Sequence, residues 1–303
     1  LTVGWVMAAQ ALSGIAKDLN KMSAKSAVKL LVPSDAQGRL YHWVAVLTGS
    51  KNTLKGIGFF MGGALLANLG FRGAVLSMVC GLSLVWLASL LLLTRELGRS
   101  TARPKFTELF SKSAAINYLS AARLFLFGAR DVWFVVALPV HLAAVFGWAH
   151  LQVGAFLALW IIGYGAVQAV APRITGGLTG RPPDGPVAVR WALPLALVPF
   201  ALAITAAGPN AQLMLVAGLL VFGVLFAINS SLHSYLIVSY ATEDGVSLDV
   251  GFYYMANAAG RLLGTVLSGW LYQAQGLAIC LFVSGVFVAL AALLSLRLPR
   301  HDR

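Results

Sequence analysis

Long apolar stretches recur along the chain, and most are of a length that can cross a membrane. A transmembrane helix needs about 20 predominantly apolar residues. Nine runs of roughly this length follow one another in the 303 residues. We expect nine transmembrane helices with the approximate bounds 1–31, 41–66, 72–93, 116–142, 150–171, 189–207, 211–238, 250–272 and 276–296. The pattern therefore predicts an all-α polytopic membrane protein.

Composition agrees with this fold class. Hydrophobic residues make up 59% of the chain and charged residues 11%, whereas soluble domains carry about 25% charged residues. The net charge is +12, but many basic residues lie inside apolar runs and not on the solvated face that nucleic-acid binding requires. Cys80 and Cys280 stand alone in separate apolar stretches, which favours neither a disulfide nor a metal site. We expect membrane lipid around the chain and no nucleic-acid partner.

Basic residues between the runs gather on one side of the predicted topology. Lysine and arginine are enriched in the cytoplasmic loops of membrane proteins. On that side lie Arg39, Arg95, Arg99, Arg103, Lys105, Lys112, Arg173, Arg181, Arg190, Arg297, Arg300 and Arg303. Only Arg72 lies on the opposite side. The asymmetry predicts a multi-pass inner-membrane protein whose C-terminus is cytoplasmic.

Charged residues inside the runs follow a pattern of their own. The third, sixth and ninth runs carry almost no charge, which is typical of helices at the periphery of a bundle. In the first run Lys17, Lys21, Lys25 and Lys29 recur every four residues and form a slowly winding stripe on a helix. Such a stripe is typical of an amphipathic helix lying on anionic lipid, or of a polar seam lining a cavity that translocates anions.

The remaining runs favour the cavity. Lys51, Lys55, Arg123, Arg130 and Arg261 also lie in apolar runs, and only Asp18 and Asp131 oppose them there. Each unpaired cation at the centre of a bilayer costs about 2.5–3.5 kcal/mol, and a multiply charged anion would offset that cost. The predicted substrate-binding residues are Lys17, Lys21, Lys25, Lys51, Lys55, Arg123, Arg130, Asn257 and Arg261.

Two residues are candidates for proton coupling. His233 follows Asn229 by one helical turn, and an imidazole titrates near neutral pH, although a polar packing role also fits. Asp131 is the second candidate, with an ion pair to Arg130 as the alternative. No clustered acid/base pair, HExxH motif or phosphate-binding glycine loop occurs, so we expect neither an enzyme nor a protein that uses a cofactor, a metal or ATP directly.

Several motifs resemble those of the major facilitator superfamily. They are AQALSGIA in the first run and the stretch from Gln37 to Gly73, which contains the GxxxG pair Gly58 and Gly62. Gly56 and Gly63 widen the smooth face of this pair, and we expect such small residues to let helix backbones approach closely. The resemblance implies twelve helices in four triplets, of which helices 4–12 are visible here and three are missing at the N-terminus. It divides the chain into part of an N-terminal bundle at 1–94, a cytoplasmic linker at 95–113 and a C-terminal six-helix bundle at 114–303.

A more specific resemblance rests on GIAKDLNKMSAKSAVKLLVP, LTGSKNTLKGIGFFMGG and LSAARLFLFGARDVWFVVALPV. These stretches are similar to the ArsJ-type organoarsenical efflux permeases. The resemblance implies export of 1-arseno-3-phosphoglycerate by alternating access, arsenate resistance, and a functional link to glyceraldehyde-3-phosphate dehydrogenase, which makes that ester. A general organophosphate, organic-anion or drug permease of the same fold is the alternative, and a lipid-binding scaffold is a third.

Overall fold

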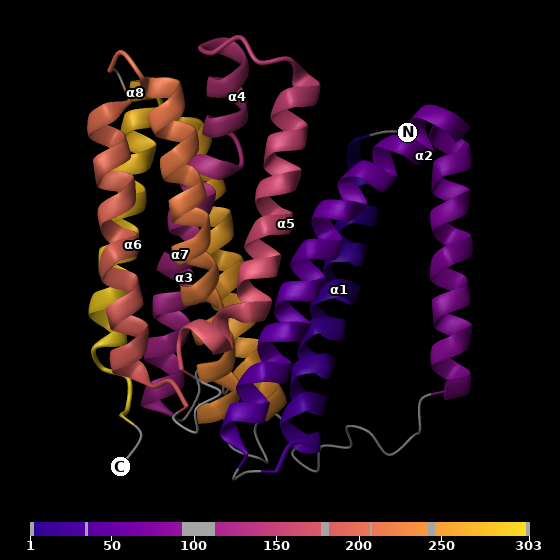
Figure 1. Ribbon diagram of the computed structural model, residues 1–303. Coiled ribbons are helices and arrows are strands. Elements are labelled where there is room, and N and C mark those ends of the chain that lie inside the picture. Colours follow the sequence, from indigo (N-terminus) through magenta and orange to yellow (C-terminus); the bar gives the residue numbers. More distant parts are fainter. Residues whose placement is uncertain are drawn as a thin grey trace.

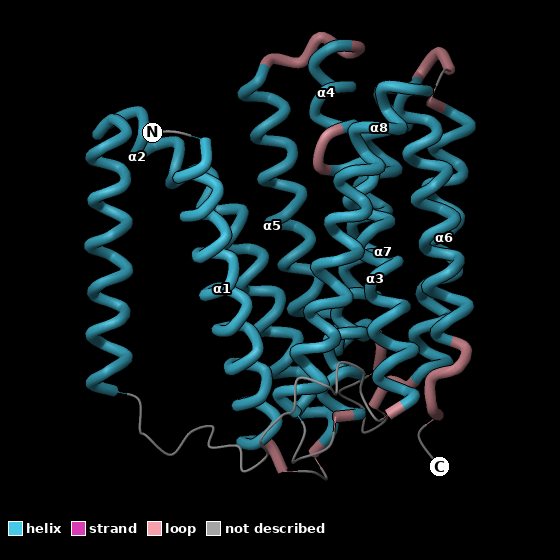
Figure 2. Tube along the Cα trace, turned by 180° about the vertical axis from the view of Figure 1, so that it is seen from behind, coloured by secondary structure: helices cyan, strands magenta, loops and turns pink. Residues whose placement is uncertain are grey.

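The structure is a computed structural model that describes residues 3–33, 36–92, 113–176, 182–206, 208–241 and 246–300. Within these ranges every regular element is an α-helix (Figures 1 and 2). Six of the helical segments are long and apolar enough to cross a membrane. The elements are α1 (Val3–Leu31), α2 (Gln37–Leu92), α3 (Ala114–Phe134), α4 (Ala137–Ala144), α5 (His150–Ile174), α6 (Gly185–Thr205), α7 (Ala211–Tyr240) and α8 (Val246–Ser295).

Two of these helices consist of two legs that run in opposite directions (Figure 1). The reversal in α2 lies at Gly70, where φ is 65°, and the reversal in α8 lies at Gly276, where φ is 76°. Positive φ values of this kind are open to glycine at no steric cost. When the two legs of α2 and of α8 are counted separately and α3 and α4 together, the described residues contain nine helical legs, which agrees with the prediction of about nine helices from the apolar runs.

The uncharged runs lie at the edges of the molecule. Figure 1 places α6 at one edge and the second leg of α2, residues 71–92, at the opposite edge, with α3 and α7 between them. Side chains of that leg are largely exposed, for example Leu82 at 70% and Leu91 at 86%. The expected peripheral position of the third and sixth runs is therefore confirmed.

Helices α3 and α8 are packed backbone against backbone. A Cβ atom at Gly260 would lie 2.0 Å from the carbonyl oxygen of Leu124, and one at Gly264 would lie 2.7 Å from that of Gly128. Small residues permit this approach between helices in a membrane. Next to this contact, Trp133 is completely buried in the apolar core of the C-terminal bundle. The approach fixes the side chains that project from α3 and α8 relative to one another.

The first leg of α2 packs on α5 through glycines other than the expected pair. A Cβ atom at Gly49 would lie 2.5 Å from the carbonyl oxygen of Gly165, and one at Gly56 would meet Ile162 at the same distance. Around Gly58 and Gly62, in contrast, a Cβ atom would meet nothing within 4 Å among the described residues. Within the part of the chain that the structure describes, the close contact of this glycine-rich stretch is therefore made by Gly56 and not by Gly58 or Gly62.

Several predictions fall on residues that are not described. The linker predicted at 95–113 lies outside the described residues except for Ser113, and so do its basic side chains. Arg181 and Arg303 are likewise outside them. The division of the chain into 1–94 and 114–303 stays a prediction.

Candidate functional site

Eight cationic side chains from four helices share one region between α1–α2 and the C-terminal bundle. The charge of Lys25 interacts with those of Arg123, Lys51 and Lys21, and the charge of Lys55 with those of Arg130, Arg261 and Lys17. Two carboxylates are close to these cations: the charge of Asp18 interacts with that of Lys51, and the charge of Asp131 with that of Lys55. We call this region the basic site; its cations are Lys17, Lys21, Lys25, Lys51, Lys55, Arg123, Arg130 and Arg261.

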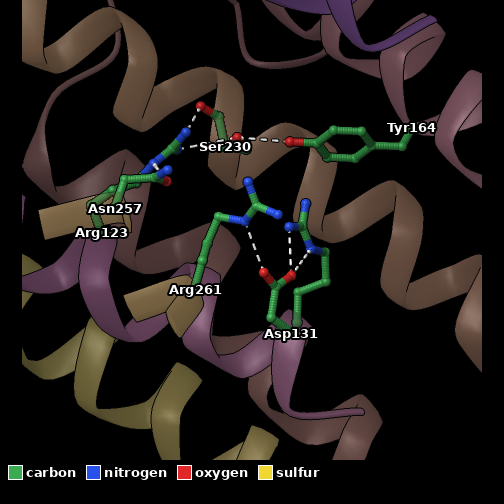
Figure 3. A network of polar contacts seen from close by, with 7 residues as sticks. Arg123, Asp131, Tyr164, Ser230, Asn257 and Arg261 are labelled. Atoms are coloured by element: carbon green, nitrogen blue, oxygen red, sulfur yellow. Dashed lines mark hydrogen bonds and ion pairs between the residues drawn. The ribbon is translucent and has the colours of Figure 1, made fainter. Parts of the chain in front are cut away.

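Arg123 on α3 is the buried arginine of the basic site, with 4% of its surface exposed. Its Nε donates to Asn257 Oδ1 on α8 at 3.1 Å, and its Nη1 donates to the carbonyl oxygen and Oγ of Ser230 on α7 at 3.2 and 3.1 Å. Tyr164 on α5 donates its hydroxyl to the same Ser230 Oγ at 2.9 Å (Figure 3). All these partners are neutral, so they hold the guanidinium in place and leave its charge uncompensated.

Asp131 forms a separate network about two helical turns beyond Arg123 on α3 (Figure 3). The carboxylate is fully buried and accepts from Arg130 Nε at 2.6 Å and from Arg261 Nε on α8 at 2.8 Å. One carboxylate therefore serves two guanidinium groups and ties α3 to α8. The ion pair between Arg130 and Asp131 was one of the alternatives open from the sequence, and the pair with Arg261 is added by the fold.

Lys25 on α1 is buried in an aromatic environment. Only 3% of its surface is exposed, and among the described residues its Nζ has no hydrogen-bond acceptor. The Nζ lies 5.7 Å from the ring centre of Tyr253 and 5.2 Å from that of Tyr254 on α8. Cation–π attraction compensates part of the charge, and an acceptor for its three N–H groups is still missing.

The other lysines of the basic site are more accessible. Lys21 pairs with Asp18, as the spacing of three residues predicts. Lys17, Lys51 and Lys55 are exposed. Flexible, hydrated ammonium groups of this kind act as point charges that can follow a bound anion.

His233 and Asn229 do not form a unit in this structure. Asn229 donates from Nδ2 to the carbonyl oxygens of Trp191 and Leu225, at 2.8 and 2.9 Å, and so joins α7 to α6. His233 is buried beside Arg123, and its Nδ1 has no partner among the described residues. Proton coupling by His233 or Asp131 stays a prediction.

Sequence reasoning placed the cations and missed the groups that fix them. Ser230 was not singled out, because a serine within an apolar helix is common and its contact with Arg123 joins residues 107 positions apart. The same holds for Phe127, whose ring centre lies 3.8 Å from Arg123 Cζ. Its spacing of four residues from Arg123 on one helix face was the available signal.

Direct hydrogen bonds join the two groups of helices around the basic site. Hydrogen bonds from α1 and α2 to the C-terminal bundle join Ser26 to Ser247 at 3.3 Å, Tyr41 to Thr175 at 3.1 Å, and Asn52 to Gln168 at 2.5 Å. The first two bonds involve residues near the C-terminal ends of α1 and α5 and the N-terminal ends of α2 and α8. The end of α1 and the start of α2 lie toward the same end of the molecule as the C-terminus (Figure 1). On α1, residues 15–17 and 19–20, nearer its N-terminal end, are exposed. Bonds between the two groups of helices therefore lie toward the end nearer the C-terminus, while part of α1 toward its other end is exposed.

Comparison with known proteins gives the fold a wider context. No protein-family model matches the chain, and no curated protein sequence matches it. Among solved structures it is similar to the human organic anion transporter MFSD10 (TETRAN), with a TM-score of 0.73 and 17% identity over 95% of this chain and 70% of that protein. It is also similar to a bacterial homologue of the iron transporter ferroportin in an outward-facing state, with a TM-score of 0.64 and 16% identity.

The second match covers 89% of this chain and 65% of the ferroportin homologue, so the chain spans about two thirds of the length of each neighbour. At such low identity the likeness establishes the architecture. The neighbours, the helical structure and the apolar segments agree on a multi-pass membrane protein. The chain has the major facilitator fold.

Proposed function

We propose that this protein is a secondary active transporter of a small organic anion that works by alternating access. The observation that carries the proposal is the imbalance of charge in the basic site, where eight cations face two carboxylates. Burying cations without counterions is costly, and a bound anion with several charged oxygens would offset that cost. The site lies between the two groups of helices, α1–α2 and α3–α8, where a carrier would expose it to either side in turn.

The proposed substrate is 1-arseno-3-phosphoglycerate, exported across the inner membrane to confer arsenate resistance. Support comes from the resemblance of three stretches, which include Lys25, Lys51 and Arg123, to the ArsJ-type permeases. Phosphate and arsenate groups both offer oxygens that guanidinium can bind bidentately. Glyceraldehyde-3-phosphate dehydrogenase would supply the ester on the cytoplasmic side, where the positive-inside rule places the C-terminus.

A general organophosphate, organic-anion or drug permease is the second candidate, and the human neighbour, an organic anion transporter, favours it. The third candidate, a scaffold whose lysine stripe lies on lipid, needs the lysines on an open surface. Lys25 is buried against Tyr253 and Tyr254, and this burial supports a cavity over a lipid surface.

Transport into everted membrane vesicles tests the proposal. Glyceraldehyde 3-phosphate, NAD, the dehydrogenase and radiolabelled arsenate are added outside, and uptake of arsenic is followed. Wild-type vesicles are compared with Lys25→Met and Arg123→Gln, and Arg39→Gln serves as a control because this exposed arginine lies outside the basic site. We expect uptake that requires the dehydrogenase, is lost in the first two variants and is kept in the control.

Two other results would change the proposal in different ways. Uptake of arsenate without the dehydrogenase would remove the ester as substrate and keep an anion carrier. The protein would not be an anion transporter if its vesicles took up no more arsenic than vesicles without it, and no more of any phosphorylated organic acid.

A further inference from the structure

The charged side chains of the basic site lie at two levels along the helix axes. On α3 Arg123 and Arg130 are seven residues apart, and on α8 Tyr254 and Arg261 have the same spacing. Seven residues correspond to about 10 Å along a helix. On α1, which runs in the opposite direction, Lys25 lies eight residues after Lys17.

Electrostatic contacts agree with two levels for these cations except Lys51, whose charge interacts more strongly with those of Lys21 and Lys17 than with that of Arg123. Lys25 interacts with Arg123, and the ring centre of Tyr253 lies 5.7 Å from Lys25 Nζ and 5.0 Å from Arg123 Cζ. We call Lys25 and Arg123 the closed-end layer, because Lys25 lies beside Ser26, which is bonded to Ser247 on α8.

The second level has different members. Lys55 interacts with Arg130, Arg261 and Lys17, and also with the carboxylate of Asp131. We call Lys17, Lys55, Arg130 and Arg261 the open-end layer, because Lys17 and Lys55 are exposed. The pair of Lys21 with Asp18 lies between the layers on α1, and Lys51 on α2 interacts with both members of this pair.

The two layers differ in their internal counterions. Among the described residues, no carboxylate forms an ion pair with Lys25 or Arg123. In the open-end layer, Asp131 already holds Arg130 and Arg261 at hydrogen-bond distance. The side chain of Arg261 is 41% exposed, whereas that of Arg130 is 14% exposed. Of the two arginines, Arg261 can therefore turn to a ligand with less rearrangement.

We propose that the basic site consists of these two anion-binding layers, and that it selects a substrate with an anionic group at each end of a short chain. This inference rests on the proposed function and names its substrate class. The closed-end layer binds one compact anionic group between Lys25 and Arg123. The second group enters the open-end layer, where it is bound by Lys55 and replaces Asp131 as the partner of Arg261.

Each layer has a distinct expected signature. An anion with one charged group occupies the closed-end layer alone, because no internal carboxylate competes there. Removing Lys25 therefore weakens the binding of every anion, whereas removing Lys55 weakens only anions that reach both layers. A hydrogen bond to a charged group contributes about 1.5–3 kcal/mol, which corresponds to a change in affinity on the order of tenfold or more.

Calorimetric titration of the purified protein with two stable probes tests the division. Glycerol 3-phosphate carries one anionic group, and propane-1,3-diol bisphosphate carries two on a chain of the same length. In wild-type protein we expect the bisphosphate to bind on the order of tenfold more tightly. Lys55→Met removes that preference and keeps the affinity for glycerol 3-phosphate, while Lys25→Met lowers both affinities about equally.

The controls separate the layers from folding and from the proposed function. Arg39→Gln keeps both affinities, and Arg123→Gln tests the closed-end layer if Lys25→Met does not fold. Equal affinity of wild-type protein for the two probes, or equal losses for both probes in Lys55→Met, would overturn the two layers and leave an anion carrier. Absence of binding by either probe to folded wild-type protein would overturn the anion site itself.

Discussion

The cations on α3 and α8 and those on α1 and α2 are held in opposite ways. Arg123 donates to Asn257 and Ser230, and Arg261 shares Asp131 with a neighbouring arginine. In contrast, Lys25 on α1 has no acceptor among the described residues, and Lys55 on α2 is exposed. Arginine forks are fixed by planar, directional bonds, whereas lysines act as mobile point charges.

This contrast indicates a division of labour within the basic site. We call the arginines on α3 and α8 the arginine side, which is preorganised because hydrogen bonds already hold it. We call the lysines on α1 and on the first leg of α2 the lysine side, which is mobile because the partners of its charges are not yet in place. An anion bound between them completes the lysine side and leaves most bonds of the arginine side intact. Variants on each side should therefore differ in whether they affect folding or binding.

The largest expected effect comes from Asp131→Ala on the preorganised side. The variant leaves Arg130 and Arg261 without their shared carboxylate inside the bundle. Breaking a buried pair by removing one partner costs about 3–5 kcal/mol. We expect a loss of this size in the free energy of unfolding, measured by denaturant titration of the purified protein in detergent.

Asp18→Ala is the matched control on the mobile side. The side chain of Asp18 is 48% exposed and pairs with Lys21. An exposed pair contributes about 0–1 kcal/mol, so the two aspartate variants should differ several-fold in their effect. Equal destabilisation by the two variants would contradict the contrast between the sides.

The second effect concerns the close packing of α3 on α8, which fixes the arginines of the two helices relative to one another. A Cβ atom at Gly260 would overlap the carbonyl oxygen of Leu124, so Gly260→Ala must push α8 away from α3. Overpacking of this kind costs about 1–3 kcal/mol. We expect a lower unfolding temperature and weaker anion binding, because Asn257 and Arg261 lie on the displaced helix face.

Gly269→Ala, on the same leg of α8, controls for the change in helix propensity. A Cβ atom there would meet nothing within 4 Å among the described residues. Alanine favours a helix by about 1 kcal/mol over glycine, so this variant should be neutral or more stable. An unfolding temperature that falls by the same amount in both variants would argue against the close contact of α3 with α8.

Much of the fold was predictable, because a bilayer imposes a length and an apolar composition on each crossing. The reversal at Gly70 fell where the sequence ended one run and began the next. The break between α3 and α4 was not predictable, because Val135 and Val136 carry no turn signal and the freed N–H of Ala137 is bonded by Ser268, 131 positions away.

The basic site was predictable as a set of charges and not as a set of bonds. Cations inside apolar runs can be found from the sequence alone, as Lys25 and Arg123 were. Their partners depend on which helices become neighbours, so Asp131 was matched with the adjacent Arg130, while its bond to Arg261 required the fold. The exposure of each lysine could not be predicted either, because Lys25 and Lys17 belong to one stripe but only Lys25 is buried.

The third effect tests the rigidity of the arginine side at the break that follows Asp131. Ser268 Oγ accepts from the backbone N–H of Ala137 at 3.0 Å, and both residues are fully buried. Leaving such a donor unsatisfied costs about 1–3 kcal/mol. We expect Ser268→Ala to lower the free energy of unfolding by about 1–2 kcal/mol in denaturant titration.

Ser284→Ala, also on α8, is the matched control. This serine is equally buried, and its Oγ has no hydrogen-bond partner among the described residues. Removing an unsatisfied hydroxyl should be neutral or slightly stabilising. A loss in Ser284→Ala as large as that in Ser268→Ala would mean that the bond to Ala137 does not stabilise the break.

The smallest effect concerns one of the bonds that join the two sides. Asn52 on α2 donates to Gln168 Oε1 on α5 at 2.5 Å, next to the close contact of Gly49 with Gly165. Hydrogen bonds between helices in a membrane average about 0.6 kcal/mol. A double-mutant cycle of Asn52→Ala and Gln168→Ala should therefore give a coupling energy on this order, measured as the free energy of unfolding.

A weak bond between Asn52 and Gln168 would suit a contact that breaks and re-forms during transport. If α2 and α5 move apart during transport, Asn52 and Gln168 must separate in every cycle, and a strong bond would trap one state. We therefore expect both single variants to change the transport rate more than they change stability, with vesicle uptake as the measurement. A coupling energy of several kcal/mol would instead make this contact a permanent part of the fold, and the mobile side would then have to begin at α1 alone.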